Sequence, residues 1–252
     1  ERYQYLILAS HILIGLEELS MDFGLSEVQQ MIKASARDFL SKECSPRTVR
    51  SIESHDTKLS DNLWKKAIEM GWLGLAFPYR YGGSDGGLLD LGVLLEEMGR
   101  SLWSGSFFPT VVLGGLTVLE NGTEEQKDNI IPGITSGELL MTLALIESDA
   151  TYSPSGLKTK ASLNNGEYIV NGTKIFVADA QKADIMLLVA RTNNYDPRNP
   201  TDGITVFLVP TDSPGIEVIP LRTIGIDEQY IVTLNNVSIP VANTLGGVDM
   251  GW

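Results

Sequence analysis

The residue types that most often perform catalysis or bind metals are few in this sequence. It has one cysteine, Cys44, and two histidines, His11 and His55. A zinc site needs several Cys or His ligands at short spacing, so none is predicted. No serine lies in a nucleophile elbow, and no phosphate-binding glycine loop follows a strand. Cys44 is interpreted as a small apolar residue near a helix end, because no histidine or cation cluster accompanies it.

The composition is that of a globular protein with a strongly acidic surface. The 252 residues are 43% hydrophobic and 20% charged, with a formal net charge of −13. Such a surface repels nucleic acid and anionic lipid, so neither is predicted as a partner. A nucleotide-bearing ligand would need a local site of backbone amides or positive side chains. A single cysteine excludes an internal disulfide, which favours a reducing compartment, and we expect a cytoplasmic location.

The first twenty residues differ from the rest. Residues 5–16 (YLILASHILIGL) are apolar but too few to cross a bilayer as a helix, so no membrane span is predicted. No basic segment precedes them, as a signal peptide would require. We interpret residues 1–20 as an N-terminal extension, with the first domain starting at Met21.

Residues 21–137 have the pattern of helices. Ser26 and Gln29 form a capping box ahead of a helix over 28–44. Ser60 is expected to cap a second helix that ends at Gly71, and apolar spacing predicts a third over 88–102. A further helix is expected to start at Thr123 with Gln126 as its capping partner. Pro132 and Gly133 are expected to help end that helix.

Residues 138–252 have the pattern of strands. Short runs rich in Val, Ile, Leu and Tyr cover 139–147, 167–172, 174–177, 184–192, 203–210, 216–221 and 229–239. Asn165-Gly166 and Asn171-Gly172 are turn signals, and 193–203 is predicted to be a surface loop between strands. The predicted fold class is α+β: an all-α domain, 21–137, followed by an antiparallel β-barrel or sandwich domain, 138–252.

Several segments, in a fixed order, resemble one enzyme family. Residues 71–101 (GWLGLAFPYRYGGSDGGLLDLGVLLEEMGRS) join a Pro-x-x-Tyr-Gly-Gly turn to a Glu-Glu-x-Gly-Arg helix end, as acyl-CoA dehydrogenases do. Residues 156–192 are similar to the middle β domain of that family, and so are FLVPTDSPGIEV and LNNVSIPVANTLGG further on. The resemblance covers about residues 21–252.

The resemblance implies an FAD-dependent oxidoreductase of lipid metabolism. In that family the flavin lies against the β domain and accepts a hydride from an acyl-CoA substrate, giving a 2-enoyl-CoA. The base is a carboxylate of a C-terminal helical domain, which this sequence is expected to lack, so no catalytic residue is assigned. A homo- or hetero-oligomer of such chains and an acceptor such as an electron-transfer flavoprotein are also implied.

The flavin segments of the family carry over with substitutions. The implied cofactor-binding residues are Leu143, Leu145, Ile146, Thr151, Tyr152, Phe176, Val177 and Ala178, and Tyr152 is also implied to contact substrate. Ile146 replaces a family threonine, Thr151-Tyr152 replaces a small Gly-Ser pair, and Phe176-Val177-Ala178 replaces Trp-Ile-Thr. Glu147 matches the family, and a structural role is favoured over that of a substitute base.

These departures leave two hypotheses open. In the first, backbone groups still bind FAD, and the chain is a fragment or subunit of an acyl-CoA dehydrogenase completed by a helical domain. In the second, the flavin site has decayed, and the chain is a non-catalytic, flavin-poor assembly subunit of a hetero-oligomeric acyl-CoA dehydrogenase. In both, apolar surface left open on the two domains favours association.

Overall fold

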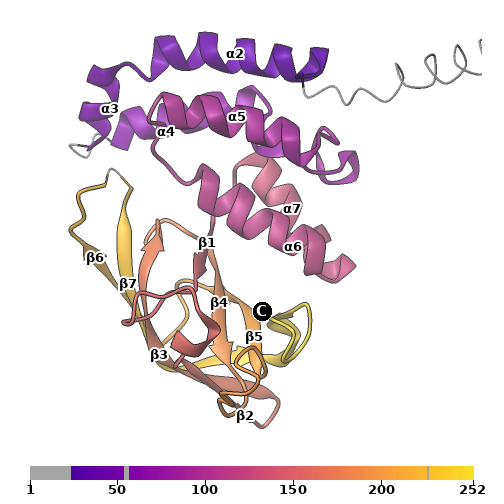
Figure 1. Ribbon diagram of the computed structural model, residues 1–252, viewed down its shortest axis with the longest axis vertical. Coiled ribbons are helices and arrows are strands. Elements are labelled where there is room, and N and C mark those ends of the chain that lie inside the picture. Colours follow the sequence, from indigo (N-terminus) through magenta and orange to yellow (C-terminus); the bar gives the residue numbers. More distant parts are fainter. Residues whose placement is uncertain (1–23, 54–56, 226) are drawn as a thin grey trace, which may run out of the picture.

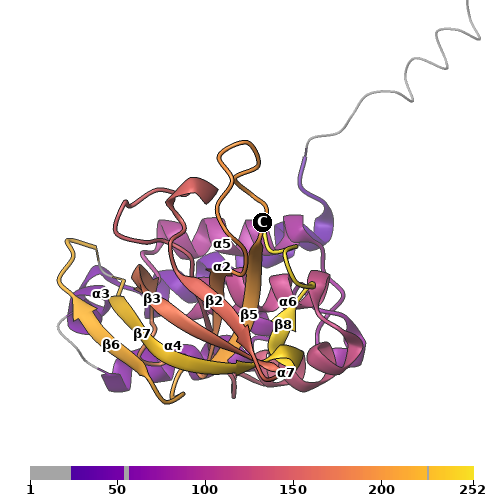
Figure 2. The ribbon, with the colours of Figure 1, turned by 90° about the horizontal axis from the view of Figure 1, so that it is seen from below.

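The computed structural model describes residues 24–53, 57–225 and 227–252. The predictions about residues 1–20, His11 and His55 concern positions outside these ranges. Within them, a layer of helices lies against a single sheet (Figure 1). Seen from below, the strands lie in front of the helices (Figure 2).

The helices occupy the first half of the chain. They are α2 (Glu27–Glu43), α3 (Pro46–Glu53), α4 (Thr57–Glu69), α5 (Leu88–Arg100), α6 (Leu116–Asn121) and α7 (Glu124–Ser136), with a π-helix at Phe108–Gly115. The capping boxes predicted at Ser26 and Thr123 are confirmed: each side chain accepts a hydrogen bond from the backbone N–H three residues on, at 3.2 Å. These ends follow local sequence because the capping partners are three residues apart.

Two predicted helix boundaries are wrong. Helix α4 begins at Thr57, so Ser60 lies in its first turns and is not the cap. Pro132 lies inside α7, which continues to Ser136 and ends at Gly137 with φ +77°. Burial of Ile131 and Ile134 on the core side of α7 holds the helix through its proline, which local sequence alone disfavours.

Among the described residues, eight strands form the second half. They are β1 (Met141–Ala144), β2 (Lys160–Asn164), β3 (Glu167–Ala178), β4 (Ile185–Arg191), β5 (Ile204–Pro210), β6 (Ile216–Leu221), β7 (Gln229–Pro240) and β8 (Thr244–Leu245). The order across the sheet is β6-β7-β3-β2-β4-β5-β8, and β1 pairs with β4. Most neighbours are antiparallel, while β1–β4 and β2–β4 are parallel. The prediction of a helical domain followed by a mainly antiparallel β domain is confirmed, as a mixed sheet that does not close.

One of the two predicted turns is confirmed and the other is wrong. Asn165 and Gly166, with φ of +50° and +85°, connect β2 to β3 as a hairpin. Asn171-Gly172 lies inside β3, at a shift of register between Val170 and Gly172 against β7. The glycine serves packing there, because a Cβ on Gly172 would lie 2.3 Å from Thr159 Oγ1. The predicted loop 193–203 connects β4 to β5.

The two halves share a core. One buried cluster includes helix residues such as Leu40 and Ile131 and extends to Met141, Leu187 and Leu208 of the sheet. A second cluster, including Val170, Phe207 and Val232, belongs to the sheet alone. The helical layer therefore packs against β1 and β4, and the loop of the candidate site follows β1.

Candidate functional site

The loop after β1 runs beside the end of β3. Ile175 of β3 donates its backbone N–H to the carbonyl oxygen of Ile146 at 2.9 Å. A tight turn follows, in which the Ala150 N–H bonds to Glu147 O at 2.8 Å. The two segments implied to contact flavin, 143–152 and 176–178, are therefore brought close to each other.

The outer part of this loop carries three of the predicted residues. Leu145, Thr151 and Tyr152 line one hollow of about 10 Å³, together with Glu147, Ser153, Gly156, Leu157 and Trp252. A volume of that size holds about one water molecule. Tyr152 is 71% exposed. A ring system would therefore have to lie over the loop rather than inside it.

The second segment is shaped by a bulge. The pairing of β3 with β7 shifts register between Lys174 and Val177, and Phe176 has φ +54°. The ring of Phe176 is 46% exposed, whereas Val177 is buried in the sheet core. A side-chain contact to a ligand is therefore open to Phe176, while Val177 can offer backbone groups only. Ala178 is half-buried, and its carbonyl oxygen accepts the Thr142 hydroxyl at 2.5 Å.

The loop also offers unpaired backbone donors. Within the described part of the chain, the N–H groups of Ser148, Asp149, Thr151 and Tyr152 have no hydrogen-bond partner. An exposed run of free amides can bind an acceptor-rich ligand. With the exposed ring of Phe176, these donors fit a flavin held mainly through backbone groups. Ile146 and Ala178 have no hydroxyl to add, and Leu143 packs its side chain against the core.

Beneath the loop lies a buried ion pair. Lys174 is fully buried, and its Nζ lies 2.7 Å from Glu147 Oε1 and 3.2 Å from Leu145 O. The Glu147 carboxylate also accepts the backbone N–H groups of Lys158, at 2.8 Å, and Thr159, at 3.0 Å. The structural role expected for Glu147 is consistent with these contacts, which engage both of its oxygens.

The charges of this pair depend on each other. Burial opposes the ionisation of Glu147, but Lys174 and the Thr159 N–H hold the pKa of the carboxyl below its ordinary value. Burial lowers the pKa of Lys174 to about 8, although Glu147 opposes that shift. The sequence reading missed Lys174. A signal for it was available in β3. Tyr168 and Val170 face inward, and Lys174 lies six and four residues after them, so strand alternation places its cation on the buried face.

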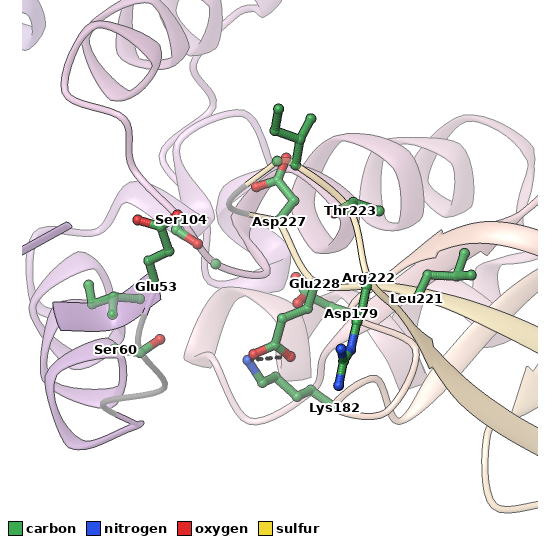
Figure 3. A pocket seen from close by; sticks show the side chains of 14 residues that line it. Glu53, Ser60, Ser104, Asp179, Lys182, Leu221, Arg222, Thr223, Asp227 and Glu228 are labelled. Atoms are coloured by element: carbon green, nitrogen blue, oxygen red, sulfur yellow. Dashed lines mark ion pairs between the residues drawn. The ribbon is translucent and has the colours of Figure 1, made fainter. Parts of the chain in front are cut away.

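A larger hollow opens where the helices meet the sheet (Figure 3). Its volume is about 420 Å³. One of its lining residues is Asp179, which directly follows the predicted segment 176–178. The lining residues are Ile52, Glu53, Ser60, Ser104, Gly105, Asp179, Lys182, Leu221, Arg222, Thr223, Ile224, Gly225, Asp227 and Glu228. They come from α3, α4, the segment before the π-helix, the connection between β3 and β4, the end of β6, and the connection between β6 and β7. Because these elements are far apart in sequence, no motif predicted the hollow.

The lining is mixed, and its charged residues include four carboxylates and two cations: Glu53, Asp179, Asp227, Glu228, Lys182 and Arg222. Lys182 Nζ pairs with Glu228 Oε2 at 3.1 Å, the interaction drawn as a dashed line in Figure 3. Asp179 is 7% exposed, and burial raises the pKa of its carboxyl, which Lys182 partly offsets. The hollow can therefore hold a polar group beside the edge of the loop site.

The described ranges hold neither a cluster of metal ligands nor a helix that could span a membrane. No cluster there brings three or more Cys, His, Asp or Glu side chains together as metal ligands. Among the same residues, no helix has both the length and the apolar character needed to cross a membrane.

Comparison with known proteins identifies both halves. Residues 26–138 match the family model described as acyl-CoA dehydrogenase, N-terminal domain, and residues 142–237 match acyl-CoA dehydrogenase, middle domain. The probable acyl-CoA dehydrogenase YngJ of Bacillus subtilis (strain 168) is 32% identical over 238 residues, or 92% of this chain and 61% of that protein.

Solved structures give the same relationship. Butyryl-CoA dehydrogenase from Megasphaera elsdenii superposes with a TM-score of 0.76 at 28% identity, covering 92% of this chain and 61% of that one. The ChsE4–ChsE5 complex from Mycobacterium tuberculosis gives a TM-score of 0.77 at 26% identity, covering 92% and 59%. The chain thus spans about six tenths of the length of these relatives.

Proposed function

The chain belongs to the acyl-CoA dehydrogenase family, and on that premise we propose that it supplies the flavin-facing part of an FAD-dependent acyl-CoA dehydrogenase. The reaction would be the α,β-dehydrogenation of an acyl-CoA thioester to a 2-enoyl-CoA. One observation carries the proposal: the hydrogen bond from the Ile175 N–H to the Ile146 carbonyl oxygen, at 2.9 Å, holds the first implied flavin segment beside the residue that precedes the second.

The contacts to FAD would be mainly backbone contacts. The free amides of Thr151 and Tyr152 would donate to acceptor atoms of the cofactor, while Phe176 would lie against the ring system. Leu143, Leu145, Ile146, Val177 and Ala178 would contribute shape and main-chain groups, and Tyr152 would also contact the substrate. Bound FAD would supply the hydride acceptor.

The base is not assigned to this loop. A base must have an oxygen free to accept the α-proton. Both oxygens of Glu147 already accept hydrogen bonds from Lys174, Lys158 and Thr159. We place the base on a helical domain that continues this chain or belongs to a partner, and expect the isolated chain to be inactive.

The family relationship also supports partners. We propose that the chain works in a homo- or hetero-oligomer of acyl-CoA dehydrogenase-like chains and passes electrons to an acceptor such as an electron-transfer flavoprotein. The ChsE4–ChsE5 structure, a complex of two different chains, supports the hetero-oligomeric form. A cytoplasmic location is proposed from the single cysteine.

The test is the visible absorption spectrum of the chain, purified alone and after incubation with excess FAD. Flavin bands that remain with the protein through gel filtration are the expected result. Phe176→Ala should lower the amount retained. Tyr79→Ala, which removes an even more exposed ring from the helical half, should leave it unchanged. A colourless protein that takes up no FAD would contradict the proposal.

A second candidate rests on a different observation. Ile146 and Ala178 have no hydroxyl, and Tyr152 adds bulk over a hollow of only about 10 Å³. These features favour a flavin-poor assembly subunit. Under that hypothesis the unmodified chain takes up no FAD, and restoring the family residues with Ala178→Thr and Tyr152→Ser should create affinity. Failure of these variants to gain FAD would count against a decayed flavin site.

A further inference from the structure

The buried ion pair of Lys174 and Glu147 joins three separate segments of the chain. Lys174 comes from β3, Glu147 from the loop after β1, and the amides of Lys158 and Thr159 from the segment that leads into β2. Lys174 also donates to Leu145 O at 3.2 Å. One ammonium group therefore holds both the side chain and the backbone of the loop.

The position of Lys174 in β3 relates the ion pair to the exposed ring of Phe176. Lys174 is the last residue before the shift of register in β3, and Val177 is the first one after it. Regular alternation would turn Phe176 to the same face as Lys174. The bulge instead leaves Phe176 46% exposed while Lys174 and Val177 stay buried.

Folding alone does not call for a charged pair at this position. Replacing a buried ion pair by apolar side chains of similar volume is often neutral or stabilising, because the charges lose their hydration. What an apolar pair cannot do is form hydrogen bonds with Leu145 O and with the amides of Lys158 and Thr159. The specific contribution of the pair is therefore the shape of the loop.

We infer that Lys174 is a positioning residue: through Glu147 and Leu145 it holds the loop 145–152 in its ligand-ready form before any ligand arrives. The loop then presents its free amides beside Phe176 without a further ordering step. Preorganisation of this kind lowers the cost of binding. The identity of the ligand as a flavin rests on the proposed function. The inference that Lys174 holds the loop in place does not depend on it.

The test is amide hydrogen exchange on the chain without FAD, comparing the unmodified protein with Lys174→Met and with the pair Lys174→Met, Glu147→Gln. We expect the N–H groups of Ala150, Lys158 and Ile175 to exchange about tenfold faster or more in both variants, because local opening becomes easier. Amides of the β4–β5 ladder should be unchanged. The control is Lys182→Met, which breaks an exposed ion pair and should leave all these rates unchanged.

Two results would overturn the inference. Unchanged exchange in the loop would mean that Lys174 does not hold it, and equally faster exchange across the sheet would mean that its role is only structural. FAD retention through gel filtration is the second readout, and both Lys174 variants should retain at least tenfold less than the unmodified chain. If the unmodified chain retains no FAD, the proposed function fails, while the exchange data still decide the role of Lys174.

Discussion

Thr110 and Met141 are 31 residues apart in the sequence, yet the hydroxyl of Thr110 bonds to both backbone polar groups of Met141. Thr110 Oγ1 accepts the Met141 N–H at 3.0 Å and donates to the Met141 carbonyl oxygen at 3.2 Å, and both residues are buried. A side chain of the π-helix thereby takes the place of a neighbouring strand at the first residue of β1. The helical and sheet halves are joined at the point where the candidate loop begins.

Thr110→Val should therefore destabilise the protein. The substitution keeps the shape of the side chain but leaves the Met141 N–H and C=O buried without a partner, at a cost of about 1–3 kcal/mol. Thr110→Ser keeps the hydroxyl and should cost less. Urea unfolding of both variants measures the difference, and equal stability of the Val variant and the unmodified chain would contradict the assignment.

Glu97→Gln should loosen the contact between α2 and α5. The Glu97 carboxylate is fully buried and pairs with Arg37, at 2.6 Å, and with Arg100, at 2.9 Å. Both arginines are about half exposed, so water can solvate them after the change, and the expected loss is about 1–3 kcal/mol. Glu96→Gln, on the same helix but paired at the surface with Lys33, is the matched control, and its effect should stay below about 1 kcal/mol.

The loss of stability caused by Glu97→Gln should depend on pH in one direction. Hydrogen bonds from Arg37, and then from Arg100, lower the pKa of Glu97 from 4.5 to about 2, although burial opposes the shift. The folded state thus binds this proton less readily than the unfolded chain. The contribution of ionised Glu97 to the free energy of unfolding is complete at pH values above its ordinary pKa of 4.5. This contribution is lost as the pH falls from 4.5 towards 2. The difference in free energy of unfolding between Glu97→Gln and the unmodified chain should therefore narrow over that range. A difference that stays constant would contradict this role of Glu97.

Two glycines should respond to alanine in opposite ways. Gly92 lies in the middle of α5 with no atom within 4 Å of an added Cβ, so Gly92→Ala should stabilise by about 0.5–1 kcal/mol. At Gly172 a Cβ would lie 2.3 Å from Thr159 Oγ1, and Gly172→Ala should destabilise by about 1–3 kcal/mol. Thermal unfolding midpoints should move up for the first variant and down for the second.

Arg191→Lys should release two loops at once. The buried guanidinium donates to four backbone carbonyl oxygens, those of Pro154, Leu157, Pro200 and Asp202, at 2.7–3.3 Å. A lysine has three donors on one nitrogen and cannot reproduce this fork. Limited proteolysis should cut residues 193–203 faster in the variant. Arg198→Lys, in the same loop but with a highly exposed side chain, should not change the rate.

The sequence was sufficient where the determining contacts are local. The capping boxes at Ser26 and Thr123 and the Asn165-Gly166 hairpin were predicted, because each is set by residues at most three positions apart. The change from helices to strands was predicted for the same reason, since periodicity is a property of neighbours. Ordered motifs also predicted the family and, with it, the segments 143–152 and 176–178.

The features that the sequence did not give depend on distant partners. Pro132 stays helical because Ile131 and Ile134 are buried, and Gly172 continues a strand because β7 and Thr159 lie beside it. The hollow of about 420 Å³ exists only where α3, α4 and the β6–β7 connection meet.

The order of the elements, the family and the segments of the candidate site all follow from patterns within the sequence. Only the tertiary structure decided how that site is held: Lys174 buried under Glu147, Phe176 turned outward by a bulge, and Val177 turned inward. The physical reason is that desolvation and hydrogen bonding of a buried group depend on which segments surround it, and residues far apart in the chain supply those segments.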